Sequence, residues 1–222
     1  MTRAKLCGLG TAADVRAAVD AGADALGFVT DVDVDTPREV APERAADLVS
    51  AVPPFVTTVA VTIPESVGAA VEVTEQVDPD AIQIHGEFGA DGVREIRERA
   101  GVDVIVAIGT DERGRARDLD GVADALLVDS LTDEAAGGTG ETHDWDATRE
   151  LRAELDTPLV LAGGLTPENV REAVETVDPF AVDVASGVER DDESGRKNHD
   201  ALDAFVREAY RAHETEPPAE GV

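Results

Sequence analysis

Lys5-Leu6-Cys7-Gly8 is the stretch around which the rest of the chain can be organised, and it lies in an apolar run from Ala4 to Leu9. Such a run is typical of a short buried strand. Cys7 is the only cysteine and stands near the strand's end, where it is either a small buried apolar residue or a catalytic base. Lys5 lies two residues earlier, so its side chain should share a face with Cys7 and could lower the pKa of the thiol.

Seven further apolar, β-rich runs follow the first one along the chain. They are short and continuous rather than alternating, which is typical of parallel strands covered on both faces. The runs are Ala25–Val29, Phe55–Thr62, Ala81–Ile84, Val102–Ile108, Ala125–Val128, Leu159–Leu161 and Ala181–Val184.

Amphipathic helical patterns lie between these runs, and several open with a capping residue. Thr11, Asp144, Asp146 and the pair Thr166-Pro167 stand where helix caps would stand. The clear helical patterns are Thr11–Ala21, Pro42–Val52, Glu65–Gln76, Asp91–Ala100, Asp146–Glu154, Pro167–Thr176 and His199–Ala212.

Eight strand–helix units without a linker favour a closed (β/α)8 TIM barrel, of the α/β class, over an open doubly wound sheet. The fifth connection, from Asp111 to Gly121, is charged and has the weakest pattern, and we also predict a helix there. A length of 222 residues suits one domain, which we place at residues 1–212. Residues 213–222 form an acidic, proline-containing tail that we expect to be disordered.

The composition limits the compartment, the partners and the cofactors that we expect for this protein. The chain has no run of about 18 apolar residues and no basic-plus-apolar leader, so we expect no membrane partner and a cytoplasmic location. A single cysteine allows no internal disulfide and no cysteine-rich metal site. Histidines and carboxylates are not clustered at ligand spacing, so we expect no metal.

The chain is strongly acidic, with 48 Asp+Glu against 19 Lys+Arg, a formal net charge of -29 and a pI near 4.2. The bases are nearly all arginine, since Lys5 and Lys197 are the only lysines. Such a surface repels itself unless concentrated salt screens it. This favours an enzyme of a salt-rich cytoplasm over a merely acidic mesophilic enzyme. Nucleic acid is excluded as a partner because the chain has no positive stripe.

In a barrel of this kind, chemistry takes place at the carboxyl ends of the strands. Cys7 ends the first predicted strand and Asp129 follows the sixth, so the two face one another across the ring. An acid–base isomerisation needs such a pair, one group to remove a carbon-bound proton and the other to protonate oxygen. Asp129 could alternatively cap the following loop.

Glycine turns follow the seventh and eighth strands, at Gly163-Gly164 and Ser186-Gly187. Backbone without Cβ atoms can approach a phosphate closely, and this is where such barrels bind it. Tight turns that only require positive φ are the alternative. Gly138 and Gly140 lie in a glycine-rich loop after the sixth strand, which is either a lid over the ligand or a disordered connection.

Two further side chains lie at the same edge of the predicted barrel. Arg38 is the only base in the acidic loop after the second strand, and it could bind a ligand carboxylate or merely be solvated. His85 follows the fourth strand, where a structural histidine is the common case. We take both as candidate substrate-binding residues.

These residues fall in motifs that resemble the phosphoribosylanthranilate isomerase family of tryptophan biosynthesis. Any one motif is weak, but together they occur in order over nearly the whole chain. The motifs are Lys5-Leu6-Cys7-Gly8, Gly22-Ala23-Asp24-Ala25-Leu26-Gly27-Phe28, Thr36-Pro37-Arg38-Glu39-Val40, Ile82-Gln83-Ile84-His85-Gly86, Leu126-Leu127-Val128-Asp129, Gly137-Gly138-Thr139-Gly140, Asp144-Trp145, Leu161-Ala162-Gly163-Gly164-Leu165 and Val182-Asp183-Val184-Ala185-Ser186-Gly187-Val188-Glu189.

The resemblance implies a cofactor-free Amadori rearrangement of N-(5-phosphoribosyl)anthranilate to 1-(o-carboxyphenylamino)-1-deoxyribulose 5-phosphate. It assigns Asp129 as the general acid, Cys7 as the general base and Arg38 as the group that holds the anthranilate carboxylate. It also assigns the glycine turns after the seventh and eighth strands to the phosphate. The partner is thus a small phosphorylated substrate, and the resemblance leaves monomer and homodimer open.

The chain departs from the family pattern in three places. Glu141 and His143 replace a lysine and an aromatic residue common near the glycine-rich loop, the loop Asp31–Asp35 is unusually acidic, and Asn198 stands where aspartate is usual.

Two other interpretations of the sequence stay open. One is a sister barrel such as indole-3-glycerol-phosphate synthase or ribulose-phosphate epimerase, whose catalytic lysine and glutamate or metal-ligating histidines are missing. The other is a non-catalytic phosphometabolite-binding barrel.

Overall fold

The computed structural model describes residues 1–129, 144–191 and 193–212, with the side chains of 193 and 194 excepted. The predicted tail at 213–222 and the predicted lid loop lie outside the described residues. Gly138 and Gly140 lie in that loop, so their role in substrate binding stays a prediction.

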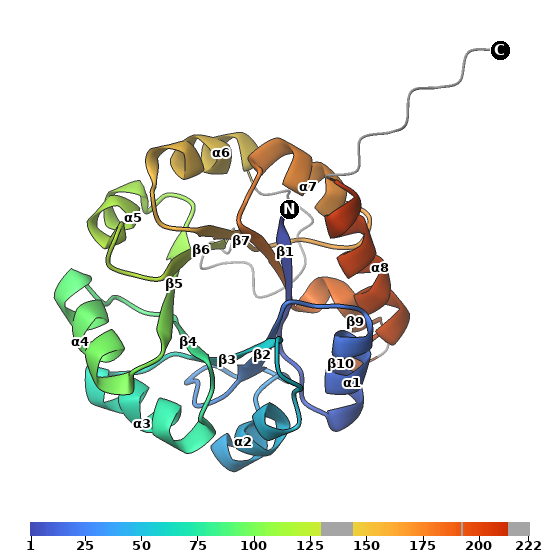
Figure 1. The fold of residues 1–222 in the computed structure, drawn as a ribbon, viewed down its shortest axis with the longest axis horizontal. Coiled ribbons are helices and arrows are strands. Elements are labelled where there is room, and N and C mark those ends of the chain that lie inside the picture. Colours follow the sequence, from blue (N-terminus) through green and yellow to red (C-terminus); the bar gives the residue numbers. More distant parts are fainter. Residues whose placement is uncertain (130–143, 192, 213–222) are drawn as a thin grey trace.

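Eight parallel strands close into a barrel in sequence order, with helices around it (Figure 1). The first strand pairs with the second and with the eighth, which closes the ring and confirms the predicted TIM barrel. The strands are β1 Arg3–Leu6, β2 Ala25–Val29, β3 Thr57–Thr62, β4 Ala81–Ile84, β5 Asp103–Gly109, β6 Ala125–Asp129, β7 Leu159–Leu161 and β8 Ala181–Val184.

A helix follows each strand, and local capping fixes where several of them begin. The Thr11 hydroxyl accepts a hydrogen bond from the backbone N–H of Asp14 at 3.1 Å, and Asn198 accepts two at the start of the last helix. The helices are α1 Ala12–Asp20, α2 Pro42–Ser50, α3 Val67–Val77, α4 Ala90–Ala100, α5 Arg113–Leu119, α6 Trp145–Glu154, α7 Val170–Val177 and α8 His199–Arg211.

The core has an outer and an inner part because successive residues of a strand point to opposite faces. Leu6 packs in the large cluster that the strands share with the helices. Cys7 instead packs with Val59 and Val61 of β3 and Ala81 of β4. Lys5 and Cys7 therefore face the barrel interior, on the side away from the helices.

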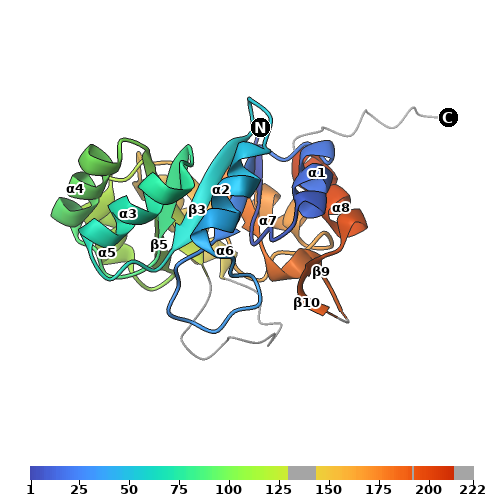
Figure 2. The ribbon, with the colours of Figure 1, turned by 90° about the horizontal axis from the view of Figure 1, so that it is seen from below.

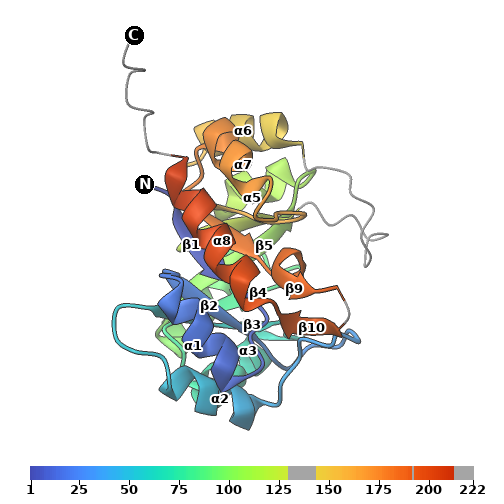
Figure 3. The same cartoon turned by 90° about the vertical axis from the view of Figure 1, so that its right-hand side faces the viewer.

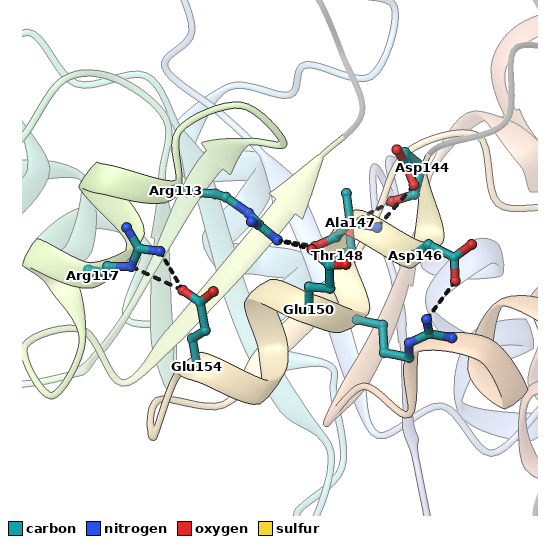
Figure 4. Close-up of polar contacts among 9 residues, drawn as sticks. Arg113, Arg117, Asp144, Asp146, Ala147, Thr148, Glu150 and Glu154 are labelled. Carbon is teal, nitrogen blue, oxygen red and sulfur yellow. Dashed lines mark hydrogen bonds and ion pairs between the residues drawn. The ribbon is translucent and has the colours of Figure 1, made fainter.

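The α5 helix, which had the weakest sequence pattern, is held to α6 by ion pairs (Figure 4). Arg113 donates to the Ala147 carbonyl at 3.1 Å and to Glu150 at 3.0 Å, and Arg117 donates twice to Glu154. Arginines four residues apart share one helix face and so meet carboxylates at the matching spacing. Charged residues here link neighbouring helices, which explains the poor apolar periodicity.

Four predicted boundaries were wrong. Thr166-Pro167 does not start α7. The Thr166 backbone N–H donates to Asn169 Oδ1 and the Thr166 hydroxyl accepts from the Glu168 backbone N–H, which forms a turn, and the helix begins only at Val170. Phe55 is not in β3: its side chain is fully exposed and its φ is +74°. Asp146 lies inside α6, which Asp144 caps at 3.0 Å.

The fourth error is at the first strand, since β1 ends at Leu6 and not at Leu9. Gly8 has a φ of +72°, which turns the chain out of the strand. The structure also has elements that the sequence did not predict: a short 3-10 helix η1 (Ser186–Val188), followed by the hairpin strands β9 (Glu189–Arg190) and β10 (Glu193–Lys197).

Candidate active site

Cys7 and Asp129 lie at the carboxyl end of the barrel. Cys7 follows β1 directly and still donates its backbone N–H to the Val184 carbonyl of β8 at 2.8 Å. Asp129 is the half-buried last residue of β6. Two strands, β7 and β8, separate β6 from β1 on the shorter way around the ring. The thiol and the carboxylate therefore stand at different sides of one barrel mouth.

The same end of the barrel carries the loop between β2 and α2 and the hairpin β9–β10, opposite the N-terminus (Figure 2). Gly195 of β10 packs against the backbone of Pro37 in that loop, and a Cβ at Gly195 would lie 2.7 Å from the Pro37 carbonyl oxygen. The hairpin and the loop that carries Arg38 are thus in direct contact.

A buried ion pair lies next to Cys7. Lys5 Nζ is 2.9 Å from Asp183 Oδ1, and both residues are less than a tenth exposed. The thiol adjoins this pair over Gly27, where a Cβ would lie 2.7 Å from Cys7 Sγ and 3.1 Å from Lys5 Nζ. The prediction that Lys5 shares a face with Cys7 is confirmed, and Gly27 provides the space that brings the two groups together.

Burial governs the ionisation of the thiol. Burial raises the pKa of Cys7 above its ordinary value. The charge of Asp183 adds to this rise, and the charges of Lys5 and Lys197 oppose it. The sequence suggested that Lys5 would lower the pKa of Cys7. Lys5 does act in that direction, but Asp183 offsets the charge of Lys5. The loss of hydration raises the pKa of Cys7 by more than Lys5 lowers it. At neutral pH the resting group is a thiol.

Lys5 itself keeps its proton firmly. Burial acts to lower the pKa of Lys5, but the carboxylate of Asp183 and then the thiolate form of Cys7 outweigh that effect and raise it. The interior of the barrel mouth therefore holds a fixed positive charge paired with a fixed negative one.

Arg38 is not a solvated loop arginine. Its Nε donates to Glu189 Oε1 at 2.7 Å and its Nη2 to Glu189 Oε2 at 3.2 Å. The same carboxylate accepts from Lys197 Nζ at 3.1 Å and from the Gly195 backbone at 3.0 Å. Burial alone would raise the pKa of Glu189, but Arg38, Gly195 and Lys197 hold it below the ordinary value. Glu189 therefore stays ionised and fixes both cations.

His85 is a neutral side chain in this site. Burial, together with the positive charge of Lys5, lowers the pKa of His85 to about 4. Its Nε2 is 3.0 Å from Gln83 Nε2, so the amide donates and the ring proton lies on Nδ1. Gln83 Oε1 is buried and has no partner among the described residues. The pair presents an N–H donor and an amide acceptor.

The turns after β7 and β8 pack backbone against backbone. Gly163 and Gly164 have φ values of +85° and +64°, which glycine adopts without strain. A Cβ at Gly187 would overlap the carbonyl oxygen of Leu165. The close approach of these two turns leaves backbone groups at the surface of the mouth, with Ser186 beginning η1 beside them.

The sequence missed four residues of the site: Gln83, Asp183, Glu189 and Lys197. They surround the predicted groups, and two of them have partners far away in the sequence, 178 residues from Asp183 to Lys5 and 151 residues from Glu189 to Arg38. One signal could have found Lys197. Lys5 and Lys197 are the only lysines in an arginine-rich chain.

Fold and site together define an enzyme of the (β/α)8-barrel class, with titratable groups and glycine turns at the carboxyl ends of its strands. Comparison with known proteins gives the family. The family model for N-(5'phosphoribosyl)anthranilate (PRA) isomerase matches residues 4–208. The chain belongs to this family.

Individual relatives agree with the family assignment. The N-(5'-phosphoribosyl)anthranilate isomerase of Halorubrum lacusprofundi is 54% identical over 214 residues, which covers 96% of this chain and 99% of that protein. The crystal structure of phosphoribosyl anthranilate isomerase from Thermotoga maritima has a TM-score of 0.84 at 38% identity, over 95% of this chain and 99% of that one. Another isomerase structure, in complex with reduced 1-(o-carboxyphenylamino)-1-deoxyribulose 5-phosphate, has a TM-score of 0.80 at 37% identity, with the same coverage.

Proposed function

We infer that the chain isomerises N-(5-phosphoribosyl)anthranilate to 1-(o-carboxyphenylamino)-1-deoxyribulose 5-phosphate in tryptophan biosynthesis, with Asp129 as general acid and Cys7 as general base. The observation that carries these roles is the place of the two groups at the carboxyl ends of β1 and β6, around one barrel mouth. The matched structure with a reduced product at its site supports the choice of ligand.

The first step opens the sugar ring. Asp129 gives its proton to the furanose ring oxygen as the bond from C1′ to that oxygen breaks. The lone pair of the anthranilate nitrogen forms the new double bond to C1′, which leaves a protonated Schiff base. Asp129 ends this step as a carboxylate.

The second step moves a carbon-bound proton. The Cys7 thiolate takes the proton from C2′, and the electrons of that C–H bond form the C1′–C2′ double bond of an enolamine. The positive Schiff-base nitrogen accepts the displaced electrons. The enolamine then tautomerises to the ketone at C2′. Since burial raises the pKa of Cys7, only a small fraction of the resting enzyme has the thiolate that this step requires.

Two groups would fix the ends of the substrate. Arg38 uses Nε and Nη2 for Glu189, and its Nη1 is directed to neither oxygen of that carboxylate, so it is the donor left for an anthranilate carboxylate. The phosphate would lie on the backbone of Gly163, Gly164, Ser186 and Gly187. The positive φ values and the close contact of the two turns support this placement. His85 would face the ribose as a neutral donor.

The remaining proposals concern the setting of the enzyme. We place it in a salt-rich cytoplasm, working without a cofactor, as a monomer or a homodimer. Its acidity and its similarity to the Halorubrum lacusprofundi isomerase support the first of these. Among the residues the structure describes, no helix combines the length and apolarity of a membrane span.

A fluorescence assay tests the proposed function. Anthranilate and phosphoribosyl pyrophosphate would be converted to the labile substrate in molar salt, and its decay followed with the wild-type protein. We expect turnover, and for Arg38→Met a KM raised roughly 10- to 100-fold, since a charged hydrogen bond contributes about 1.5–3 kcal/mol. Arg44→Met, at an exposed position of α2, removes the same charge and should keep the wild-type KM. Substrate that decays no faster than without enzyme would contradict the proposed function.

A further inference from the structure

Both lysines of this chain lie at the base of the barrel mouth. The other 17 cationic side chains are arginines, several of which form exposed ion pairs with Asp or Glu. Lys5 and Lys197 are each 4% exposed. A lysine ammonium is a compact point charge on a flexible stem, whereas a guanidinium is a planar fork of donors.

The Lys197 ammonium is held at the end of β8, the strand next to Cys7. Lys197 lies in β10, beside the loop that carries Arg38 (Figure 3), and its side chain is fully buried. Its Nζ donates to the Ala185 carbonyl at 2.8 Å and to Glu189 Oε1 at 3.1 Å. Ala185 follows Val184, whose carbonyl accepts the Cys7 backbone N–H, and Ala185 packs in the same cluster as Cys7.

The charges around the thiol do not cancel. Lys5 and Asp183 form one neutral pair. Arg38, Glu189 and Lys197 form a triad with two cations and one carboxylate. The sum over both groups is one positive charge, which a Cys7 thiolate would neutralise. On β2, the remaining neighbour of β1, the residue against the sulfur is Gly27, which has no charge.

We propose that Lys197 is an electrostatic positioning residue for Cys7, a second ammonium whose charge favours the thiolate, with Glu189 fixing its place. Its role rests on the proposed function, in which Cys7 is the base. Lys5 is balanced by Asp183, so the surplus positive charge comes from the triad of Arg38, Glu189 and Lys197 and not from the barrel strands. Burial lowers the pKa of Lys197, while Glu189 and the Cys7 thiolate act to raise it, as expected for mutually stabilising charges.

The test removes the charge and reads the thiol directly. Because Cys7 is the only cysteine, ultraviolet absorbance of the thiolate, with Cys7→Ser as the blank, reports this group alone. Lys197→Met is expected to raise the thiol pKa by about one unit, as loss of a nearby opposite charge does. At a fixed pH below the thiol pKa, that shift means about tenfold less thiolate and about tenfold lower kcat/KM.

Two variants control for structure. Lys197→Arg keeps the charge and should restore much of the thiolate fraction, and Arg196→Met removes a cation from the exposed neighbouring position of the same strand and should leave the thiol pKa unchanged. Circular dichroism confirms that each variant is folded. A folded Lys197→Met protein that titrates like the wild type would overturn the inference. Absence of turnover in the wild type would instead contradict the proposed function, because the absorbance titration needs no turnover.

Discussion

At the scale of single residues, the site shows two opposing influences on one thiol. Burial in the barrel mouth raises the pKa of Cys7, and the two ammonium groups of Lys5 and Lys197 act against it. A general base must lose its proton before it can take one from substrate. The cost of burial is therefore one reason why cations occur at this position at all.

The pH dependence of a variant that lacks the general acid Asp129 should reveal the ionisation of the Cys7 thiol. The wild-type reaction requires a protonated Asp129 and an ionised Cys7 at the same time. Asp129→Asn removes the first requirement, so its residual kcat/KM should rise about tenfold per pH unit up to the thiol pKa. Because burial raises that pKa above 9.0, the rise should continue through pH 8. A residual rate that is level from neutral to mildly alkaline pH would show that Cys7 does not titrate in the reaction.

At the scale of elements, the contact between the turns after β7 and β8 can be tested with one methyl group. In Gly187→Ala, the new Cβ would meet the Leu165 carbonyl oxygen, so the two turns must separate. We expect KM to rise at least tenfold through loss of phosphate contacts, by analogy with a lost charged hydrogen bond of about 1.5 kcal/mol. Substrate saturation curves measure this directly.

Gly114→Ala is the matched control for that variant. Gly114 lies in α5, and a Cβ there has no neighbour within 4 Å. Alanine in the first turn of this helix should slightly stabilise the protein relative to glycine and leave KM unchanged. If Gly187→Ala has the wild-type KM while it remains folded, the phosphate does not lie on these turns.

The elements also show what the sequence could predict. The eight strands were found because short continuous apolar runs need helices on one side and a barrel interior on the other. The hairpin β9–β10 was missed because its strands are short and polar, so no periodicity marks them. Its role depends on Gly195 meeting Pro37 and Glu189 meeting Arg38, contacts that exist only after the barrel closes.

The same limit applies to the site. Cys7 and Asp129 could be located because strand ends gather at one edge of a closed barrel. The net pKa of the thiol could not be predicted, because it depends on burial and on Asp183, which pairs with Lys5 across β1 and β8. Cys7 and Asp129 could thus be located from the sequence, whereas the pKa of Cys7 depends on contacts that form only in the folded chain.

At the scale of the whole molecule, net charge should control stability. A formal charge of -29 on 222 residues gives strong self-repulsion, which salt reduces as the screening length falls from about 10 Å at 0.1 M to about 3 Å at 1 M. We expect Tm to rise by several degrees or more from 0.1 to 2 M KCl. Scanning calorimetry across a KCl series measures this, with a non-ionic osmolyte as control. An unchanged or falling Tm would contradict the proposed salt-rich setting.

The central claim is that Cys7 removes the C2′ proton and Asp129 protonates the ring oxygen. The most direct measurement compares the single-turnover decay of substrate fluorescence for wild type, Cys7→Ser and Asp129→Asn in molar KCl, at equal circular dichroism signal. General acid–base groups contribute about 10²–10⁴-fold each, so we predict that both variants lose at least a hundredfold in rate. A folded Cys7→Ser protein that retains the wild-type rate would show that the base lies elsewhere and that Cys7 is a core residue.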